Sequence, residues 1–67
     1  MKYSMVIQWS DVDETYIVSL PEWSDLVHTH GDTYDEAVRS GETVLTMLIK
    51  SAQEKGPPLP PPTTYVA

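Results

Sequence analysis

The sequence predicts an α+β fold in which one long helix packs on one face of a small antiparallel sheet. Residues 3–10 and 15–20 alternate between apolar and polar side chains, with the two-residue period of a strand. From Thr33 onward the apolar residues recur every three or four positions, as in an amphipathic helix. This order predicts a two-layer sandwich, β-β-β-α, that a last strand could complete.

The first two strands are expected to form a hairpin around the acidic turn at residues 11–14. Pro21 lacks a backbone N–H, so it ends the second strand or places it at an edge. Residues 26–30 are a plausible third strand, and Gly31 ends it. The large side chains on one face of residues 3–10 are expected to fill the core: Tyr3, Met5, Ile7 and Trp9. Tyr3 and Trp9 could instead be interface anchors, but sharing a face with Met5 and Ile7 favours the core.

The helix is expected from about residue 33 to 55. Thr33, with Glu36 three positions later, has the form of a capping box at the helix N-terminus. At the other end Gly56 can take a left-handed cap, and Pro57 cannot continue the helix. Residues 1–56 therefore form the α+β domain. Residues 57–67 form a proline-rich extended arm that could supply a fourth strand or an oligomerisation contact.

Composition narrows the partners. Ten acidic residues face four basic ones, a net charge of −6, which argues against direct binding of nucleic acid. The charge fits a basic protein partner, or only a solubilising surface. A chain of 67 residues buries too little surface to be very stable alone, and without cysteine it cannot be stabilised by disulfides. We therefore expect a homo-oligomer, a dimer or tetramer. No apolar run reaches the ~20 residues of a membrane span, so we expect a soluble, cytoplasmic protein.

His28 and His30 are two positions apart and would share one face of a strand. With Asp32 they are candidates for a metal site, but a closed site needs more ligands than one strand offers, and we expect none. They could instead form a pH-sensitive interface or an ordinary polar face. Thr33 and Glu36 are better explained by helix capping than by chemistry.

No catalytic arrangement is recognisable. The acids at 11–14 resemble the start of a calcium loop, but Tyr16 stands where such a loop needs glycine. No Ser-His-Asp set, lysine nucleophile or glycine-rich phosphate loop is present, so we expect neither an enzyme nor a cofactor. Trp23 and Tyr65 lie outside the periodic elements and are candidate interface anchors, together with His28 and His30.

Two segments carry a resemblance to a known family. The first is "KYSMVIQWSDVDETYIVSLPE" at residues 2–22, and the second is "GDTYDEAV" at residues 31–38. In this order and spacing they resemble the HicB-like antitoxins, small bacterial proteins, over residues 2 to about 62. The segment "EWSDL" at residues 22–26 departs from the family pattern, which commonly has a Pro-Gly-Cys-like stretch there.

The resemblance implies a partial ribonuclease-H-like fold without catalysis of its own. It also implies a partner, a small basic HicA-type ribonuclease that cleaves messenger RNA and is blocked by protein–protein binding. Many members carry a C-terminal DNA-binding domain, and this sequence ends after the arm, so we expect a short form. The alternative expectation is an orphan HicB-like homo-oligomer without a toxin.

Overall fold

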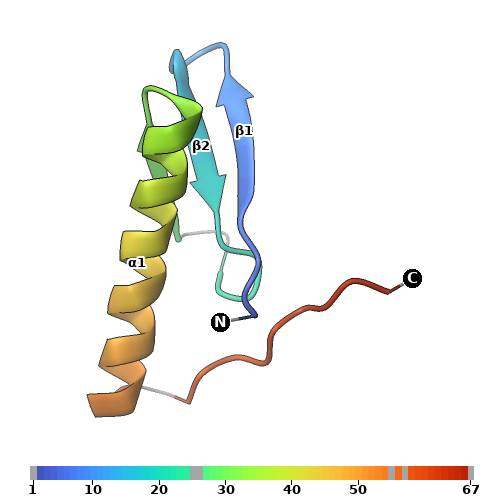
Figure 1. Cartoon of the computed structure of the whole chain (residues 1–67), viewed down its shortest axis with the longest axis vertical. Helices are drawn as coiled ribbons and strands as arrows, with labels where there is room; N and C mark the ends of the chain where they lie inside the picture. The colour runs from blue at the N-terminus through green and yellow to red at the C-terminus, as the bar shows by residue number, and fades with distance from the viewer. Residues whose placement is uncertain (1, 25–26, 55, 57, 67) are drawn as a thin grey trace.

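A computed structural model describes residues 2–24, 27–54, 56 and 58–66. Its elements follow in the order β1 (Val6–Ser10), β2 (Thr15–Ser19), β3 (His28–Gly31) and α1 (Tyr34–Glu54) (Figure 1). The predicted α+β class and the β-β-β-α order are confirmed. β1 is shorter than predicted, because residues 3–5 lead into the strand without joining it. Residue 26 of the expected third strand and residue 55 of the expected helix lie outside the described residues.

The sheet has the order β1-β2-β3 with both pairs antiparallel, so β1 and β3 are its edges. Val18 in β2 lies opposite Ile7 of β1 and Thr29 of β3. Because side chains alternate along a strand, this row faces the helix and the next row faces away. The tight β1–β2 turn is closed by Glu14, which has a φ of 53° and donates its N–H to the Ser10 carbonyl at 2.8 Å.

The core lies between β2 and α1. It is small, with four fully buried hydrophobic side chains at Val18, Leu20, Ala37 and Leu45. Gly41 on the helix lets the two layers approach closely, because a Cβ there would lie 2.5 Å from the Met5 sulfur. The half-buried side chains that surround this core come from the segment before β1, from β1, β2, the β2–β3 connection and α1: Tyr3, Met5, Ile7, Tyr16, Trp23, Val27, Val44 and Leu48.

The helix covers the sheet unevenly. α1 packs mainly on β3 and β2 and scarcely reaches β1, as Figure 1 shows. The expectation that Trp9 fills the core is therefore wrong, since 51% of its surface is exposed. Tyr3, Met5 and Ile7 do pack against the core, as expected.

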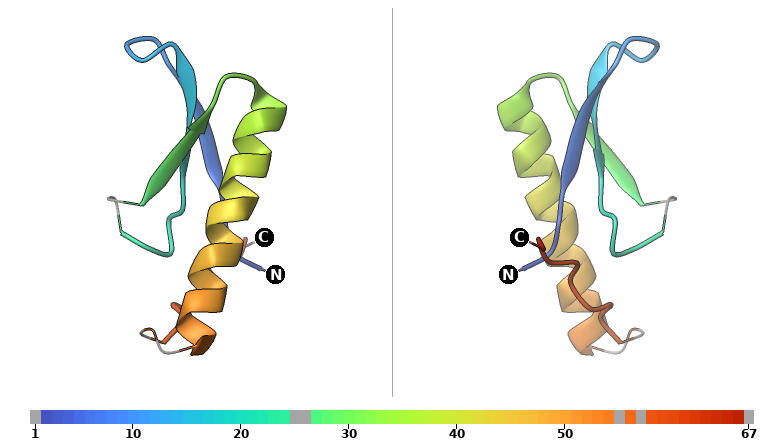
Figure 2. Two further views of the ribbon diagram at one scale, coloured as in Figure 1. Left: turned by 90° about the vertical axis from the view of Figure 1, so that its left-hand side faces the viewer. Right: turned by 90° about the vertical axis from the view of Figure 1, so that its right-hand side faces the viewer.

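The C-terminal arm runs back from the end of the helix past the start of the chain (Figures 1 and 2). Residues 58–66 form no strand, so the sheet has three strands within the described residues. The arm is held instead by the Tyr3 hydroxyl, which donates to the Pro60 carbonyl at 2.7 Å. At the helix end the Gly56 N–H donates to the Ser51 carbonyl at 2.9 Å, and no described glycine has the positive φ of a left-handed cap.

Candidate interaction surfaces

The two histidines lie on the face of the sheet that the helix leaves open. His28 lies opposite Ser19, and His30 lies opposite Ile17. Both imidazoles are exposed and line shallow hollows together with Asp13 and Ile17. Within residues 2–24, 27–54, 56 and 58–66, no group of three or more His, Cys, Asp or Glu side chains is placed to hold a metal ion. His28 and His30 therefore offer only two potential metal ligands, on a strand face that is open to solvent.

Thr33 and Glu36 form the corner between β3 and α1. The Glu36 N–H donates to Thr33 Oγ1 at 3.1 Å. The Glu36 carboxylate in turn accepts from the Asp32 N–H at 3.2 Å. The first bond satisfies a backbone donor that a helix N-terminus otherwise leaves unpaired. The second differs from a standard capping box, because the Glu36 carboxylate binds the N–H of Asp32, one residue before the cap, instead of the N–H of Thr33. Gly31 is buried beneath this corner, where any side chain would meet the backbone of Ala37.

Three aromatic rings run in a line from the edge strand to the helix. The Trp9 and Tyr16 rings, paired across β1 and β2, have centroids 5.0 Å apart at an angle of 72°. Tyr16 in turn meets Tyr34, the first residue of α1, at 5.8 Å and 89°. The Trp9 indole N–H donates to the Asp11 carboxylate at 3.0 Å. From the sequence, Trp9 was considered as an interface anchor but assigned to the core, and Tyr16 and Tyr34 were not considered as site residues.

Acidic side chains gather at the same end of the molecule. The β1–β2 turn and the β3–α1 corner lie side by side there, because Tyr16 at the start of β2 pairs with Gly31 at the end of β3 (Figure 1). Together with the three rings they form what we call the acidic–aromatic end. All of its acids are exposed, and they are six of the ten in the chain: Asp11, Asp13, Glu14, Asp32, Asp35 and Glu36.

The two predicted aromatic anchors behave differently from each other. Trp23 is half-buried, with its ring 4.7 Å from that of Tyr3, and lines a small crevice with Leu48 and Pro60. Much of its surface is therefore covered by the chain itself. Tyr65 on the arm is 92% exposed and contacts no other ring among the described residues.

Glu22 ties the two ends of the described chain together. Its carboxylate accepts from the Thr63 N–H at 2.8 Å, from the Ser4 hydroxyl at 3.0 Å and from the Ser4 N–H at 3.1 Å. Partial desolvation by itself would raise the pKa of this carboxyl, but the hydrogen bonds from Thr63 and Ser4 outweigh it and the pKa is lowered. Glu22 therefore has a structural task, which is to hold the arm.

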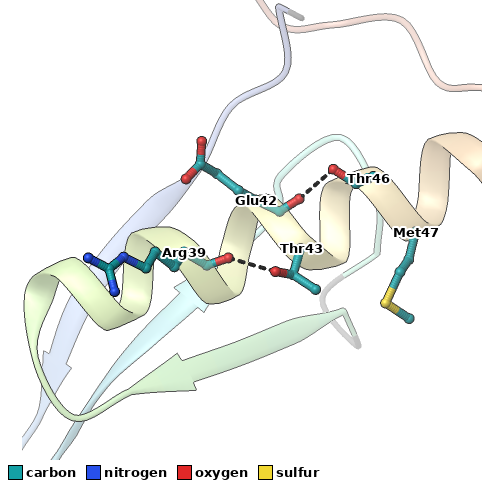
Figure 3. A pocket seen from close by; sticks show the side chains of 5 residues that line it. All are labelled: Arg39, Glu42, Thr43, Thr46 and Met47. Carbon is teal, nitrogen blue, oxygen red and sulfur yellow. Dashed lines mark hydrogen bonds between the residues drawn. The ribbon is translucent and has the colours of Figure 1, made fainter.

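The outward face of α1 carries a shallow hollow between Arg39 and Met47 (Figure 3). Its two threonines donate their hydroxyls to helix carbonyls, Thr43 to Arg39 at 3.0 Å and Thr46 to Glu42 at 2.9 Å. The Arg39, Glu42 and Met47 side chains spread apart in Figure 3, so their polar groups do not converge on one point.

Comparison of the chain with protein-family models, with curated proteins and with solved structures found no match. Among the described residues, no helix combines the length and the apolar character that a bilayer crossing requires.

Proposed function

We propose that this chain is a HicB-like antitoxin-type module that neutralises a small basic HicA-type messenger-RNA ribonuclease by binding to it. The observation that carries the proposal is the acidic–aromatic end, where six exposed carboxylates lie at the same end of the molecule as the exposed rings of Trp9 and Tyr34. The resemblance of residues 2–22 and 31–38 to the HicB-like pattern supports the same partner class.

The mechanism requires no reaction by this chain. A ribonuclease must present Lys and Arg side chains to the RNA phosphates. A surface with many exposed carboxylates competes for those side chains and speeds encounter through long-range attraction. The antitoxin thereby occupies the surface on which RNA would lie. Binding is expected to weaken as salt is raised, since exposed charges are screened.

We also propose that the chain is not an enzyme. Among the described residues, the one carboxylate whose pKa is clearly shifted is Glu22, and it is engaged in holding the arm through Ser4 and Thr63. The six acids of the acidic–aromatic end are exposed to solvent. These environments suit binding better than general acid–base catalysis, which needs a group positioned against a substrate. In the proposed role the chain acts in the bacterial cytoplasm, beside the messenger RNA that its partner cleaves.

Complex formation tests the proposal directly. The reading frames beside this chain's gene are searched for a small basic protein, which is purified, mixed with the chain and measured by size exclusion with light scattering. We expect a complex of defined mass at 150 mM salt that weakens at 1 M salt. No change in the mass of either protein, with the chain in tenfold excess, would contradict the proposal.

One observation favours a second function, an orphan homo-oligomer. β1 and β3 are both free sheet edges, and the open face carries the apolar side chains of Val6 and Ile17. Exposed edges are templates for pairing with another strand. If the arm also joins copies, deleting residues 57–67 should reduce the mass of the assembly. A purified chain whose mass is that of a monomer at all concentrations would remove this alternative.

A further inference from the structure

We infer that the acidic–aromatic end is a docking surface for an arginine-bearing segment of a basic protein, with Trp9 and Tyr34 as its anchors. The identity of the partner rests on the proposed function. The chemistry of the surface rests on the geometry, and it is tested separately below.

The first ground is that part of the sheet face is left without cover. α1 packs on β2 and β3 and scarcely reaches β1, so the face of β1 at Trp9 stands open. Trp9 is 51% exposed and Tyr34 is 57% exposed, although both rings lean on Tyr16. Large aromatic side chains that are fixed by neighbours yet open to solvent are the residues that dominate binding hot spots.

The second ground is that the ring planes of Trp9, Tyr16 and Tyr34 are held in fixed orientations. The indole N–H of Trp9 is already bonded to Asp11, which fixes the ring on one side. The neighbouring rings meet edge to face, at 72° and 89°, so each presents part of a π face beside its neighbour's edge. A planar guanidinium stacks on such a face and is attracted by its quadrupole.

The third ground is charge complementarity. Six exposed carboxylates lie at the same end of the molecule as the rings, and one of them, Asp11, accepts from the Trp9 indole N–H. Within the first two turns of α1 the one basic residue is Arg39. The guanidinium of a partner arginine could stack on Trp9 and donate to a carboxylate of the turn at the same time. Arginine suits this combination better than lysine, because its donors form a rigid fork and its plane can stack.

The same charges argue against a second copy of this chain as the occupant. Two copies meeting at this end would bring two sets of six carboxylates together, and like charges at an interface disfavour association. The open face with Val6 and Ile17 and the edge of β3 are better suited to self-association. The acidic–aromatic end therefore points to a basic partner.

Two peptides of equal charge test the chemistry without a toxin. Acetyl-Gly-Arg-Gly-Arg-Gly-amide and its lysine counterpart are titrated into the ¹⁵N-labelled full chain. We expect the arginine peptide to bind more tightly and to shift the indole N–H resonance of Trp9. Equal effects of the two peptides, or shifts confined to the open face around Ile17 and His30, would overturn the inference.

Variants then locate the surface. Trp9→Ala and Tyr34→Ala should each weaken the arginine peptide about 2- to 5-fold, as expected for an exposed cation–π contact. Tyr65→Ala is the matched control, because this ring is 92% exposed and lies on the arm, and it should change nothing. Tyr34→Ala leaves the β1–β2 pairing intact, so it decides the matter if Trp9→Ala fails to fold. Loss of peptide binding in the control variant alone would refute the assignment.

The toxin experiment separates this inference from the proposed function. If the chain binds a basic ribonuclease, Trp9→Ala should weaken that complex by about 30-fold, the effect of a hot-spot residue. A wild-type complex that survives both Trp9→Ala and Tyr34→Ala keeps the proposed function and overturns the surface. Arginine-peptide binding at Trp9 without any ribonuclease complex keeps the surface and overturns the proposed function.

Discussion

Replacing Glu22 by glutamine should release the C-terminal arm. The Glu22 carboxylate accepts from the Thr63 N–H at 2.8 Å and from the Ser4 hydroxyl at 3.0 Å, so it joins the arm to the segment before β1. A glutamine side chain has nearly the same shape but no charge, and it has one acceptor oxygen in place of two. Glu22→Gln therefore removes the charge of these bonds while leaving the packing unchanged.

The size of the effect follows from the kind of bond that is lost. A hydrogen bond to a charged group contributes about 1.5–3 kcal/mol, and a neutral one contributes about 0.5–1.5 kcal/mol. Water also binds the partly exposed Glu22 carboxylate, so the loss on replacing the charged hydrogen bonds by neutral ones is small, about 1 kcal/mol in total. An opening free energy lower by about 1 kcal/mol raises the population of the released arm about 5-fold.

The pH dependence has a definite sign. The pKa of Glu22 lies below its ordinary value of 4.5, so the unfolded chain binds the proton more readily than the folded one. The stability that this group contributes is complete above pH 4.5, and it is lost as the pH falls through the lowered pKa. The arm should therefore loosen in acid and stay closed at neutral pH.

The assay is hydrogen exchange and the chemical shift of the Thr63 amide. Exchange at neutral pH should be about 5-fold faster in Glu22→Gln, and the acid step in the wild-type shift should disappear. Glu42→Gln is the control, since Glu42 is exposed on α1 and the Thr46 hydroxyl bonds to its backbone carbonyl, which the substitution leaves in place. Unchanged exchange in Glu22→Gln, or an equal change in the control, would refute the role of this carboxylate.

Three substitutions test the fold through urea midpoints. Gly31→Ala should lower the free energy of unfolding by about 1–3 kcal/mol or more, because the added Cβ would lie 2.7 Å from backbone atoms of α1 that cannot move aside. An unchanged midpoint would count against this close packing. Gly41→Ala should stay within about 1 kcal/mol of the wild type, since the flexible Met5 can move and alanine favours the helix; a loss as large as that of Gly31→Ala would show that Met5 is fixed. Thr33→Ala should lower the free energy of unfolding by about 1 kcal/mol, because the hydrogen bond from the Glu36 N–H to the Thr33 hydroxyl is lost. An unchanged midpoint would show that this bond does not contribute to stability.

The hairpin and the helix were predictable because their causes are local. Alternation of side chains in residues 15–20 sets the face of β2, and the pairing of Thr33 with Glu36 marks the helix start. Both depend on residues within a few positions of each other. The observed helix, Tyr34–Glu54, lies within the predicted range for the same reason.

The position of Trp9 and the path of the arm were not predictable in the same way. Alternation shows that Trp9 points to the helix side of the sheet, but not that the helix stops short of β1. From the sequence, residues 57–67 could have supplied a fourth strand. The arm follows another path because the Thr63 N–H donates to the Glu22 carboxylate and the Ser4 hydroxyl donates to the Thr63 carbonyl, bonds that join residues 41 and 59 positions apart.

The acidic–aromatic end combines both situations. Its charges are visible in the sequence, yet the turn at 11–14 and the corner at 32–36 come together only through the pairing of Tyr16 with Gly31. The Tyr34 ring joins the surface through its contact with Tyr16. Sequence alone therefore predicted an acidic protein, and the register of the sheet gathered the acids beside exposed rings.

A titration of RNA cleavage tests whether this chain neutralises a ribonuclease. A small basic protein found among the reading frames beside this chain's gene is incubated with messenger RNA at 150 mM salt, and this chain is added in increasing amounts. We expect cleavage to fall in proportion to the added chain and to stop at a fixed molar ratio. Cleavage that continues unchanged in the presence of a tenfold excess of the chain would contradict this expectation.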